Sequence, residues 1–315
     1  MASKANHHYI PQFYLRGFSS GVGRQAQVFV YDNESKKSFT TLARNIGSKR
    51  HFNRVNAVGV GPNHVEDGMA EIEAGIAPHL KQVIEAKAFP SPEHFNSIMN
   101  LIAFLSVRNP RLRGSMTDFH REIVERVMSI SVSSKEIWES QNKKMRESGV
   151  PVMEDLTYEE VKRFHNERSF DVVIDQTHLI GLELGMIDPV LKHLFNRSWC
   201  FASAPEYHQF ITCDDPAILS WNEKVKQPNP YSPGHGLQNT IVIFTLSPEL
   251  ALVGLFQDLP ERSDYFPDQV TAINTVVARQ SRSQIYARDG NFLLHLRDQK
   301  NIRGFDLPRM LFGQN

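Results

Sequence analysis

The sequence predicts an α+β fold, in which a helical core of several long helices packs on a mostly antiparallel sheet formed by N-terminal and C-terminal strands. Three observations support this prediction. Short strand-like runs lie near the start of the chain, helical periodicity fills the middle, and β-branched or aromatic runs bounded by turn residues return in the last third. Strands that are segregated from helices along the chain are typical of α+β folds rather than of alternating βα units.

The N-terminal region, residues 1–62, combines a short helix with a hairpin. In the stretch "NHHYIPQFYLRGF", Pro11 lies where a helix can begin, because the N–H group that proline lacks has no partner in a first helical turn. The run "AQVFVYD" (26–32) predicts a strand. The run "SFTTL" (38–42) is its predicted hairpin partner across the polar turn "DNESKK".

The helical region, residues 63–196, begins with apolar residues at helical spacing over 65–84. Pro78 lies inside that pattern, so we expect it to kink the helix or to divide it. Ser91 as an N-cap and Pro92 at the first helical position then mark a second, largely apolar helix. Further helices are expected at 117–148, 157–167 and 170–195.

The C-terminal region, residues 197–315, contains four strand-like runs, a helix in "DQVTAINTVVARQS" and a closing strand in "SQIYAR". The four runs are "SWCFASA", "HQFITCD", "NTIVIFTLS" and "LALVGLF". A long Pro/Gly/Asn-rich loop spans 221–239, a length that is often functional in a compact domain. Because the two groups of strands can join one sheet, we predict a single intertwined domain over 1–315.

Composition excludes several classes of protein. The 315 residues carry 35 basic and 35 acidic side chains, so the chain has no overall charge with which to attract a polyanion, although a local basic groove is compatible with this balance. The two cysteines cannot form a disulfide scaffold or a CxxC zinc motif. The first residues lack the apolar core of a signal peptide, and no run approaches a membrane span. We therefore expect a cytoplasmic protein that does not bind membranes.

Two adjacent histidines, His7 and His8, are the first candidates for chemistry. Neighbouring residues of an extended segment point in opposite directions, so one imidazole can face a pocket. A neutral imidazole suits a divalent metal or a general base. The alternative is that one histidine packs in the core while the other is solvated.

Glu66 and Glu73 lie seven residues apart in a predicted helix, hence on one face. A carboxylate that borders a buried apolar stripe needs a partner or a metal, because its desolvation is costly. The alternative is that both glutamates pair with arginines. Glu71 falls off this face and is expected to be solvated.

Arg108 follows an apolar helical run, so we expect its head group to bind a specific partner. This partner is either a phosphate or carboxylate ligand, or Glu66 or Glu73.

In "QFITCDDPAIL", a strand ends in Asp214 and Asp215. An aspartate there suits a metal or acid–base site, and it equally suits the capping of a turn. We favour the capping role for one of the two.

Six blocks, taken in order, resemble the bacterial DUF4238 family over essentially the whole chain. They are "HHYIPQFYLRGF", "VEDGMAEIE", "SVRNPRLR", "FITCDDPAI", "FTLSPELALVG" and "INTVVARQSRSQIYA". The family name assigns no reaction. The resemblance implies that His7, His8, Glu66, Glu73, Arg108 and Asp214 are family-pattern positions. Cys213 replaces the serine that the family often has before the acidic pair, which argues against a serine-based mechanism there.

Two functions remain open from the sequence. The first is a metal-assisted hydrolase of the phosphodiesterase or nuclease type, for which a bacterial defence or toxin role is a natural setting. In it His7, His8, Glu66, Glu73 and Asp214 hold Mg²⁺, Mn²⁺ or Zn²⁺ and Arg108 stabilises phosphate charge, with nucleic acid or another phosphate-bearing ligand as partner.

The second is a ligand-sensing or protein-interaction module without catalysis, whose polar residues form a structural network. No Gly-rich phosphate loop is present, so no nucleotide cofactor is indicated.

We expect the histidines to converge with Glu73, Arg108 and Asp214 in one cleft between the helices and the C-terminal sheet, covered by the loop 221–239.

Overall fold

The computed structural model describes residues 5–21, 25–152, 156–168, 170–222, 232–296 and 300–310. Its contacts divide the chain into two compact units, the first made of Met1–Arg111 with Ile180–Asn315 and the second of Leu112–Leu179. The sequence leads to an expectation of one intertwined domain. The first unit is intertwined in this sense, since it combines both ends of the chain, whereas the second is a helical insertion.

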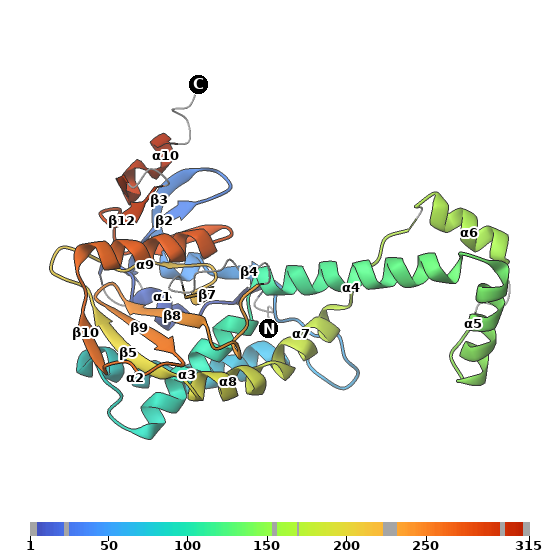
Figure 1. Cartoon of the computed structure of the whole chain (residues 1–315), viewed down its shortest axis with the longest axis horizontal. Coiled ribbons are helices and arrows are strands. Elements are labelled where there is room, and N and C mark those ends of the chain that lie inside the picture. Colours follow the sequence, from blue (N-terminus) through green and yellow to red (C-terminus); the bar gives the residue numbers. More distant parts are fainter. Residues whose placement is uncertain are drawn as a thin grey trace. The chain divides into compact units, whose positions relative to one another are not determined.

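The first unit is built around a five-stranded sheet with strand order β10-β5-β9-β8-β7 (Figure 1). Its neighbouring strands are antiparallel except for the parallel pair β10 and β5. The strands are β5 (Ser198–Ser203), β7 (Ala217–Trp221), β8 (Thr240–Ser247), β9 (Leu250–Leu255) and β10 (Arg262–Asp264).

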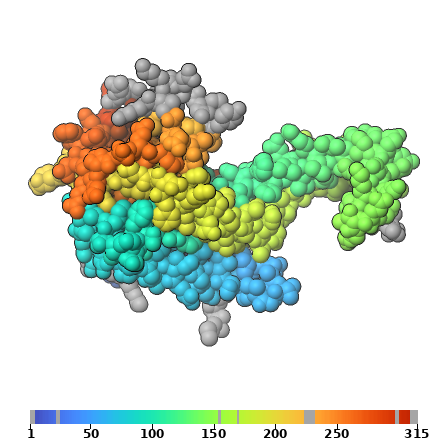
Figure 2. Space-filling view, turned by 60° about the horizontal axis from the view of Figure 1, so that its bottom comes forward, coloured from blue at the N-terminus to red at the C-terminus, as the bar shows by residue number. Residues whose placement is uncertain are grey.

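Alternation along these strands gives the five-stranded sheet two buried faces. Phe244 and its cross-strand partner Leu252 belong to a core shared with helices α2 and α3, whereas Ile243 and its partner Val253 belong to a core shared with helix α9. Figure 2 shows α2, α3 and α8 side by side on one surface of this unit. The helices are α2 (His64–Ala86), α3 (Pro92–Val107), α8 (Ile187–Phe195) and α9 (Pro267–Gln280). The α+β prediction is confirmed.

A second, four-stranded sheet joins the two ends of the chain, with the order β3-β2-β11-β6. Its strands are β2 (Gln27–Asp32), β3 (Lys37–Leu42), β6 (Thr212–Cys213) and β11 (Gln284–Ala287). N-terminal and C-terminal strands therefore do share a sheet, but most C-terminal strands form the separate five-stranded one. Two short antiparallel pairs complete the unit, β1 (Asn6–His8) with β4 (Ser48–Arg50) and β12 (Leu293–His295) with β13 (Asn301–Arg303).

Helix α1 (Gln12–Arg16) is anchored between the two sheets by Tyr14, which has no exposed surface. Its ring stacks on Phe244 with centroids 5.1 Å apart, and its hydroxyl donates to the carbonyl oxygen of Thr245 over 2.8 Å. The same hydroxyl lies 2.8 Å from Oγ1 of Thr212.

Replacing Tyr14 with phenylalanine should therefore lower the free energy of unfolding by about 1–2 kcal/mol, because two buried partners lose a hydrogen bond while the ring stays in place. Urea denaturation measures this loss. Tyr31→Phe is the matched control, since the buried hydroxyl of Tyr31 has no partner among the described residues and its removal should cost nothing. Equal losses in the two variants would contradict this account.

Three helices differ from their predicted extents. Helix α2 continues through Pro78 without division, since Ile76 and Leu80 on either side of the proline are buried and hold the helix together. The predicted helix 117–148 is two helices, α4 (Pro110–Ser131) and α5 (Lys135–Glu147), because the side chain of Ser134 caps α5 by accepting the N–H of Ile137. The predicted helix 170–195 is likewise divided, into α7 (Gln176–Gly185) and α8.

Helices α4 and α5 form the second unit with α6 (Tyr158–Asn166), and α10 (Leu307–Met310) follows β13 in the first. Helix α6 begins with a capping box between Thr157 and Glu160. None of the helices in the described ranges combines the length and the apolar composition that a bilayer crossing requires.

Candidate functional site

A small pocket of about 250 Å³ lies between the N-terminal segment and helix α2, and we call it the N-terminal pocket. Its wall on α2 consists of Glu66, Met69, Ala70 and Glu73, which follow the i, i+3, i+4, i+7 spacing of one helix face. Its other wall consists of Asn6, His8, Gln12 and Phe13. The expected cleft between the helices and the C-terminal sheet is thus replaced by one between α2 and the first strand and helix of the chain.

Glu73 is the carboxylate whose protonation is most perturbed in this pocket. Burial raises its pKa to about 7, the guanidinium of Arg108 opposes this shift, and the charge of Glu66 adds to it. A carboxyl group with such a pKa exchanges its proton near neutral pH, which is the property of a general acid or base.

This shift predicts a pH-dependent stability. Between pH 4.5 and about 7, Glu73 keeps its proton in the folded chain but has lost it in the unfolded chain. The free energy of unfolding therefore contains the full contribution of this proton below pH 4.5, and the contribution is lost as the pH rises to about 7. Relative to wild type, Glu73→Gln should gain on the order of 2–3 kcal/mol between pH 4 and pH 8. Chemical denaturation across this range measures the difference. Glu71→Gln, on the exposed side of the same helix, should run parallel to wild type, and a parallel curve for Glu73→Gln would refute the assignment.

The two histidines have different environments. His7 has no exposed surface and does not line the pocket. Its Nδ1 accepts the backbone N–H of Asn53 over 2.9 Å, so this nitrogen carries no proton, and its 4.0 Å approach to Glu66 is not an ion pair. His7 therefore fastens strand β1 to the loop that follows β4.

His8 faces the pocket. Burial lowers its pKa, so the imidazole is neutral at pH 7. Its Nε2 lies 3.2 Å from the carbonyl oxygen of Arg44 and 3.3 Å from the side-chain nitrogen of Gln12. When Nε2 carries a proton, it can donate to the carbonyl oxygen of Arg44. When Nε2 carries none, it can accept from the side-chain nitrogen of Gln12. His8 can therefore change tautomer without moving.

Arg108 lies behind the pocket and is 4% exposed. Its Nη2 donates to the backbone oxygen of His8 over 2.9 Å, and its charge acts on Glu73. Arg108 therefore ties the end of α3 to strand β1 and stabilises the ionised form of Glu73. Of the two glutamates expected as its alternative partners, Glu73 is the one on which the charge of Arg108 acts.

Asp214 does not line the pocket. Its two carboxylate oxygens accept the backbone N–H groups of Arg282, over 3.0 Å, and Ser283, over 2.8 Å. Asp214 thus caps the turn between α9 and β11, the role favoured for one of the two aspartates. Asp215 is bound by Arg111, whose Nε lies 2.6 Å from its Oδ2, and by Gln280.

The five proposed metal ligands are therefore separated: His8, Glu66 and Glu73 share the pocket, His7 is behind it, and Asp214 is elsewhere. Within the part of the chain that the structure describes, no three His, Cys, Asp or Glu side chains are already arranged around a common point as a metal would require. Any ion held by His8, Glu66 and Glu73 would need these side chains to move closer.

Asn53 is a site residue that no sequence pattern indicates. It is 1% exposed, its backbone binds His7, and its Nδ2 donates to Oε2 of Glu66 over 2.5 Å. It links the buried histidine to a pocket carboxylate. Its stretch of sequence is typical of a loop, and no spacing in that stretch indicates a buried asparagine.

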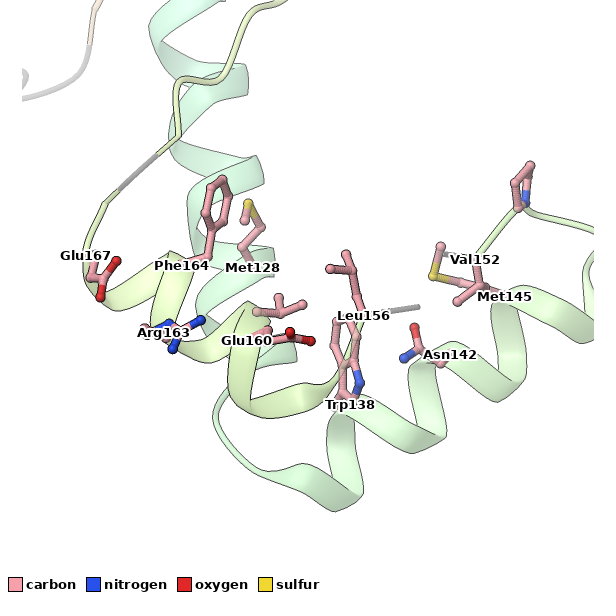
Figure 3. A pocket seen from close by; sticks show the side chains of 12 residues that line it. Met128, Trp138, Asn142, Met145, Val152, Leu156, Glu160, Arg163, Phe164 and Glu167 are labelled. Atoms are coloured by element: carbon pink, nitrogen blue, oxygen red, sulfur yellow. The ribbon is translucent and has the colours of Figure 1, made fainter. Parts of the chain in front are cut away.

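A larger, mostly apolar cavity of about 800 Å³ lies within the second unit, between α4, α5 and α6 (Figure 3). Trp138, Met145 and Phe164 are among its lining residues, and Asn142 and Arg163 add polar groups. Helix α5 has no buried residue, and its Trp138 and Met145 side chains face this cavity instead of a packed core. Of the 21 large apolar side chains exposed among the described residues, 11 belong to Leu112–Leu179, although this unit is about a fifth of the chain.

The loop 221–239, expected to cover the site, lies partly outside the described residues, which exclude 223–231. Its ends are joined by a hydrogen bond from the N–H of Asn222 to the carbonyl oxygen of Asn239.

A family model described as "Protein of unknown function (DUF4238)" matches residues 6–291. This match covers the N-terminal pocket, the second unit and the chain as far as the loop after β11. No curated protein and no solved structure matches the chain.

Proposed function

We propose, from the premise that this chain belongs to the DUF4238 family, that it is a metal-assisted hydrolase of phosphodiesters with the N-terminal pocket as its site. The observation that carries the proposal is that two carboxylates and a neutral imidazole, from Glu66, Glu73 and His8, line the same pocket. This hydrolase would act in the cytoplasm of a bacterium, either in defence or as a toxin.

The charge of the pocket determines the order of binding. Two carboxylates repel a phosphate, so a cation has to neutralise them before a phosphodiester can approach. A divalent ion held there would lower the pKa of a bound water and polarise the phosphoryl oxygen. An ion held there would favour the ionised form of Glu73, so its binding would release the proton that this carboxyl group keeps near neutral pH.

The remaining residues act as positioning residues in this proposal. His7 and Asn53 fix strand β1 and Glu66 relative to each other, and Arg108 holds the backbone of His8. Arg108 is too deeply buried to contact a substrate in the pocket, so its expected contribution is to Glu73 rather than to phosphate.

A thermal-shift experiment with Mg²⁺, Mn²⁺ or Zn²⁺ tests the proposal. An ion at about 100 times its Kd should raise Tm by roughly 5 °C in wild type. Glu66→Gln and Glu73→Gln should each abolish most of the rise, and Glu71→Gln should keep it. Hydrolysis of bis(p-nitrophenyl) phosphate should follow the same pattern. An ion effect that persists in both pocket variants, or no effect in wild type, would exclude this site.

The second candidate is a ligand-sensing or protein-interaction module without catalysis. The specific observation in its favour is the concentration of exposed apolar side chains and the apolar cavity in the second unit. In this case the contacts of His7 and Arg108 serve only to fasten strand β1. His7→Ala should then lower stability equally with and without metal, and no metal-dependent hydrolysis should be found.

A further inference from the structure

A third pocket, of about 490 Å³, lies in the first unit, far along the sequence from the N-terminal pocket, and we call it the Tyr207 pocket. Its volume is in the range of small-molecule sites. It is lined by Tyr207, His208 and Gln209 before β6, by Arg288, Asp289, Asn291 and Leu293 around the start of β12, and by Arg303 of β13.

The two walls of the Tyr207 pocket are fixed by one buried side chain. Asn274 of α9 is 1% exposed, and its Nδ2 donates to the backbone oxygens of Gln209, over 2.8 Å, and Leu293, over 3.3 Å. Its Oδ1 accepts the N–H of Ile211 over 3.0 Å. Because Gln209 and Leu293 belong to opposite walls, the pocket is formed before any ligand arrives.

A second buried side chain, Gln209, also joins the two walls of the pocket. Gln209 is 5% exposed, and its Nε2 donates to Oδ1 of Asp289 over 2.7 Å. Its Oε1 has no hydrogen-bond partner among the described residues. This oxygen is enclosed by the protein and does not meet a ligand, so the role of Gln209 is to hold its wall of the pocket against Asp289 of the other wall.

Tyr207 presents an aromatic surface at the mouth of the pocket. It is 91% exposed, and its φ of 63° lies in the left-handed region, which a tyrosine adopts only at a cost in free energy. An exposed ring held in a strained backbone next to a preformed pocket is suited to stacking on a planar ligand.

Arg303 is the cation of this lining that can contact an anion. Arg288 is paired with Glu249, and Oδ1 of Asp289 accepts hydrogen bonds from Nε2 of Gln209 and from the backbone N–H of Asn291. Arg303 is exposed and makes no ion pair within the described part of the chain. Its guanidinium is therefore available for a bidentate contact with a phosphate.

We propose that the Tyr207 pocket binds a nucleotide, with the base stacked on Tyr207 and the phosphate on Arg303. The absence of a Gly-rich phosphate loop is consistent with this arrangement, since side chains rather than backbone N–H groups hold the phosphate. The site goes beyond the proposed hydrolysis and does not depend on it. The same chemistry is offered by a free nucleoside monophosphate and by the end of a single strand.

Isothermal titration of the full chain with AMP, adenosine, inorganic phosphate and a short oligoadenylate tests the proposal. Tyr207→Ala and Arg303→Ala, both at exposed positions where the fold should tolerate them, should each weaken nucleotide binding by about tenfold. Adenosine should be sensitive to the first variant only. Phe119→Ala and Arg126→Ala, which remove an exposed aromatic and an exposed arginine in the second unit, should leave binding unchanged.

The two sources of the ligand separate in the same experiment. Tighter binding of AMP identifies a free nucleotide, and tighter binding of the oligonucleotide identifies a strand end, and either supports the site provided that Tyr207→Ala weakens it. The proposal is overturned if neither binds, if Tyr207→Ala binds as wild type does, or if inorganic phosphate binds as tightly as AMP.

Discussion

Replacing Arg111 with methionine is expected to lower the free energy of unfolding by about 2–4 kcal/mol at pH 8, because it leaves a buried carboxylate without its cation. Asp215 is 2% exposed, and its Oδ2 lies 2.6 Å from Nε of Arg111. The value is below that of a fully buried pair because the side chain of Arg111 is half exposed and partly screened by water.

The loss should depend on pH. Burial raises the pKa of Asp215 to about 6 even with Arg111 present, and the arginine acts to lower it. Without Arg111 the pKa rises further, so the protonated form persists in the fold to higher pH. The stability difference between Arg111→Met and wild type should therefore be small at pH 4 and grow as the pH rises past 6.

Urea denaturation of a double-mutant cycle measures this interaction. Asp215→Asn in the Arg111→Met background should restore most of the lost stability, since the amide carries no charge to desolvate and can still accept a hydrogen bond from Gln280. If the double variant is no more stable than Arg111→Met, the loss does not arise from the orphaned carboxylate.

Asn274→Ala is expected to cost about 2–4 kcal/mol, because it removes three hydrogen bonds from a site that water does not reach. The N–H of Ile211 and the backbone oxygens of Gln209 and Leu293 are all left without that partner. Thermal and chemical denaturation measure the effect. Arg279→Ala, at an exposed position of the same helix, should change stability by less than about 0.5 kcal/mol.

Asn274→Asp tests the same three hydrogen bonds in a second way. Asn274→Asp keeps the acceptor for Ile211 but places a carboxylate against two carbonyl oxygens, so it should be at least as damaging as alanine at neutral pH and improve on acidification. An aspartate variant as stable as wild type would mean that the two donated hydrogen bonds contribute nothing.

The elements predicted best from the sequence are those with a complete local signal. The hairpin of β2 and β3 and the helix α9 fall close to their predicted bounds, because alternation, turn residues and a proline at the first helical position all lie within a few residues of each other. The helix face of Glu66 and Glu73 was likewise predictable, since seven residues make two turns whatever the surroundings.

Other elements depend on contacts that one stretch of sequence cannot reveal. Strand β7 (Ala217–Trp221) lies in a run that begins with a turn-like "DDP", and it is a strand because β8 pairs with it. Strand β6 is reduced to two residues because Asn274 binds the backbone just before it, at Gln209 and Ile211. Both outcomes are decided by partners far away in the sequence.

The site residues divide in the same way. The polar types at the pocket were visible in the sequence, but their partners were not: Asn53 reaches His7 from a loop, and Asp214 binds the turn before β11, some 70 residues further on. The Cys213 thiol donates to the backbone oxygen of Asp215 over 3.2 Å, a contact that the sequence does not indicate.

The pairing of β2 with β11 has a consequence for biosynthesis. Val30 meets Tyr286, so the first hairpin acquires its neighbouring strand only after some 250 further residues have been translated. At about 5–20 residues per second, the edge of β2 stays open for roughly 10–50 s on the ribosome. A nascent chain in this state exposes an unpaired apolar edge, and we expect its yield to depend on chaperones that shield such edges until synthesis passes β11.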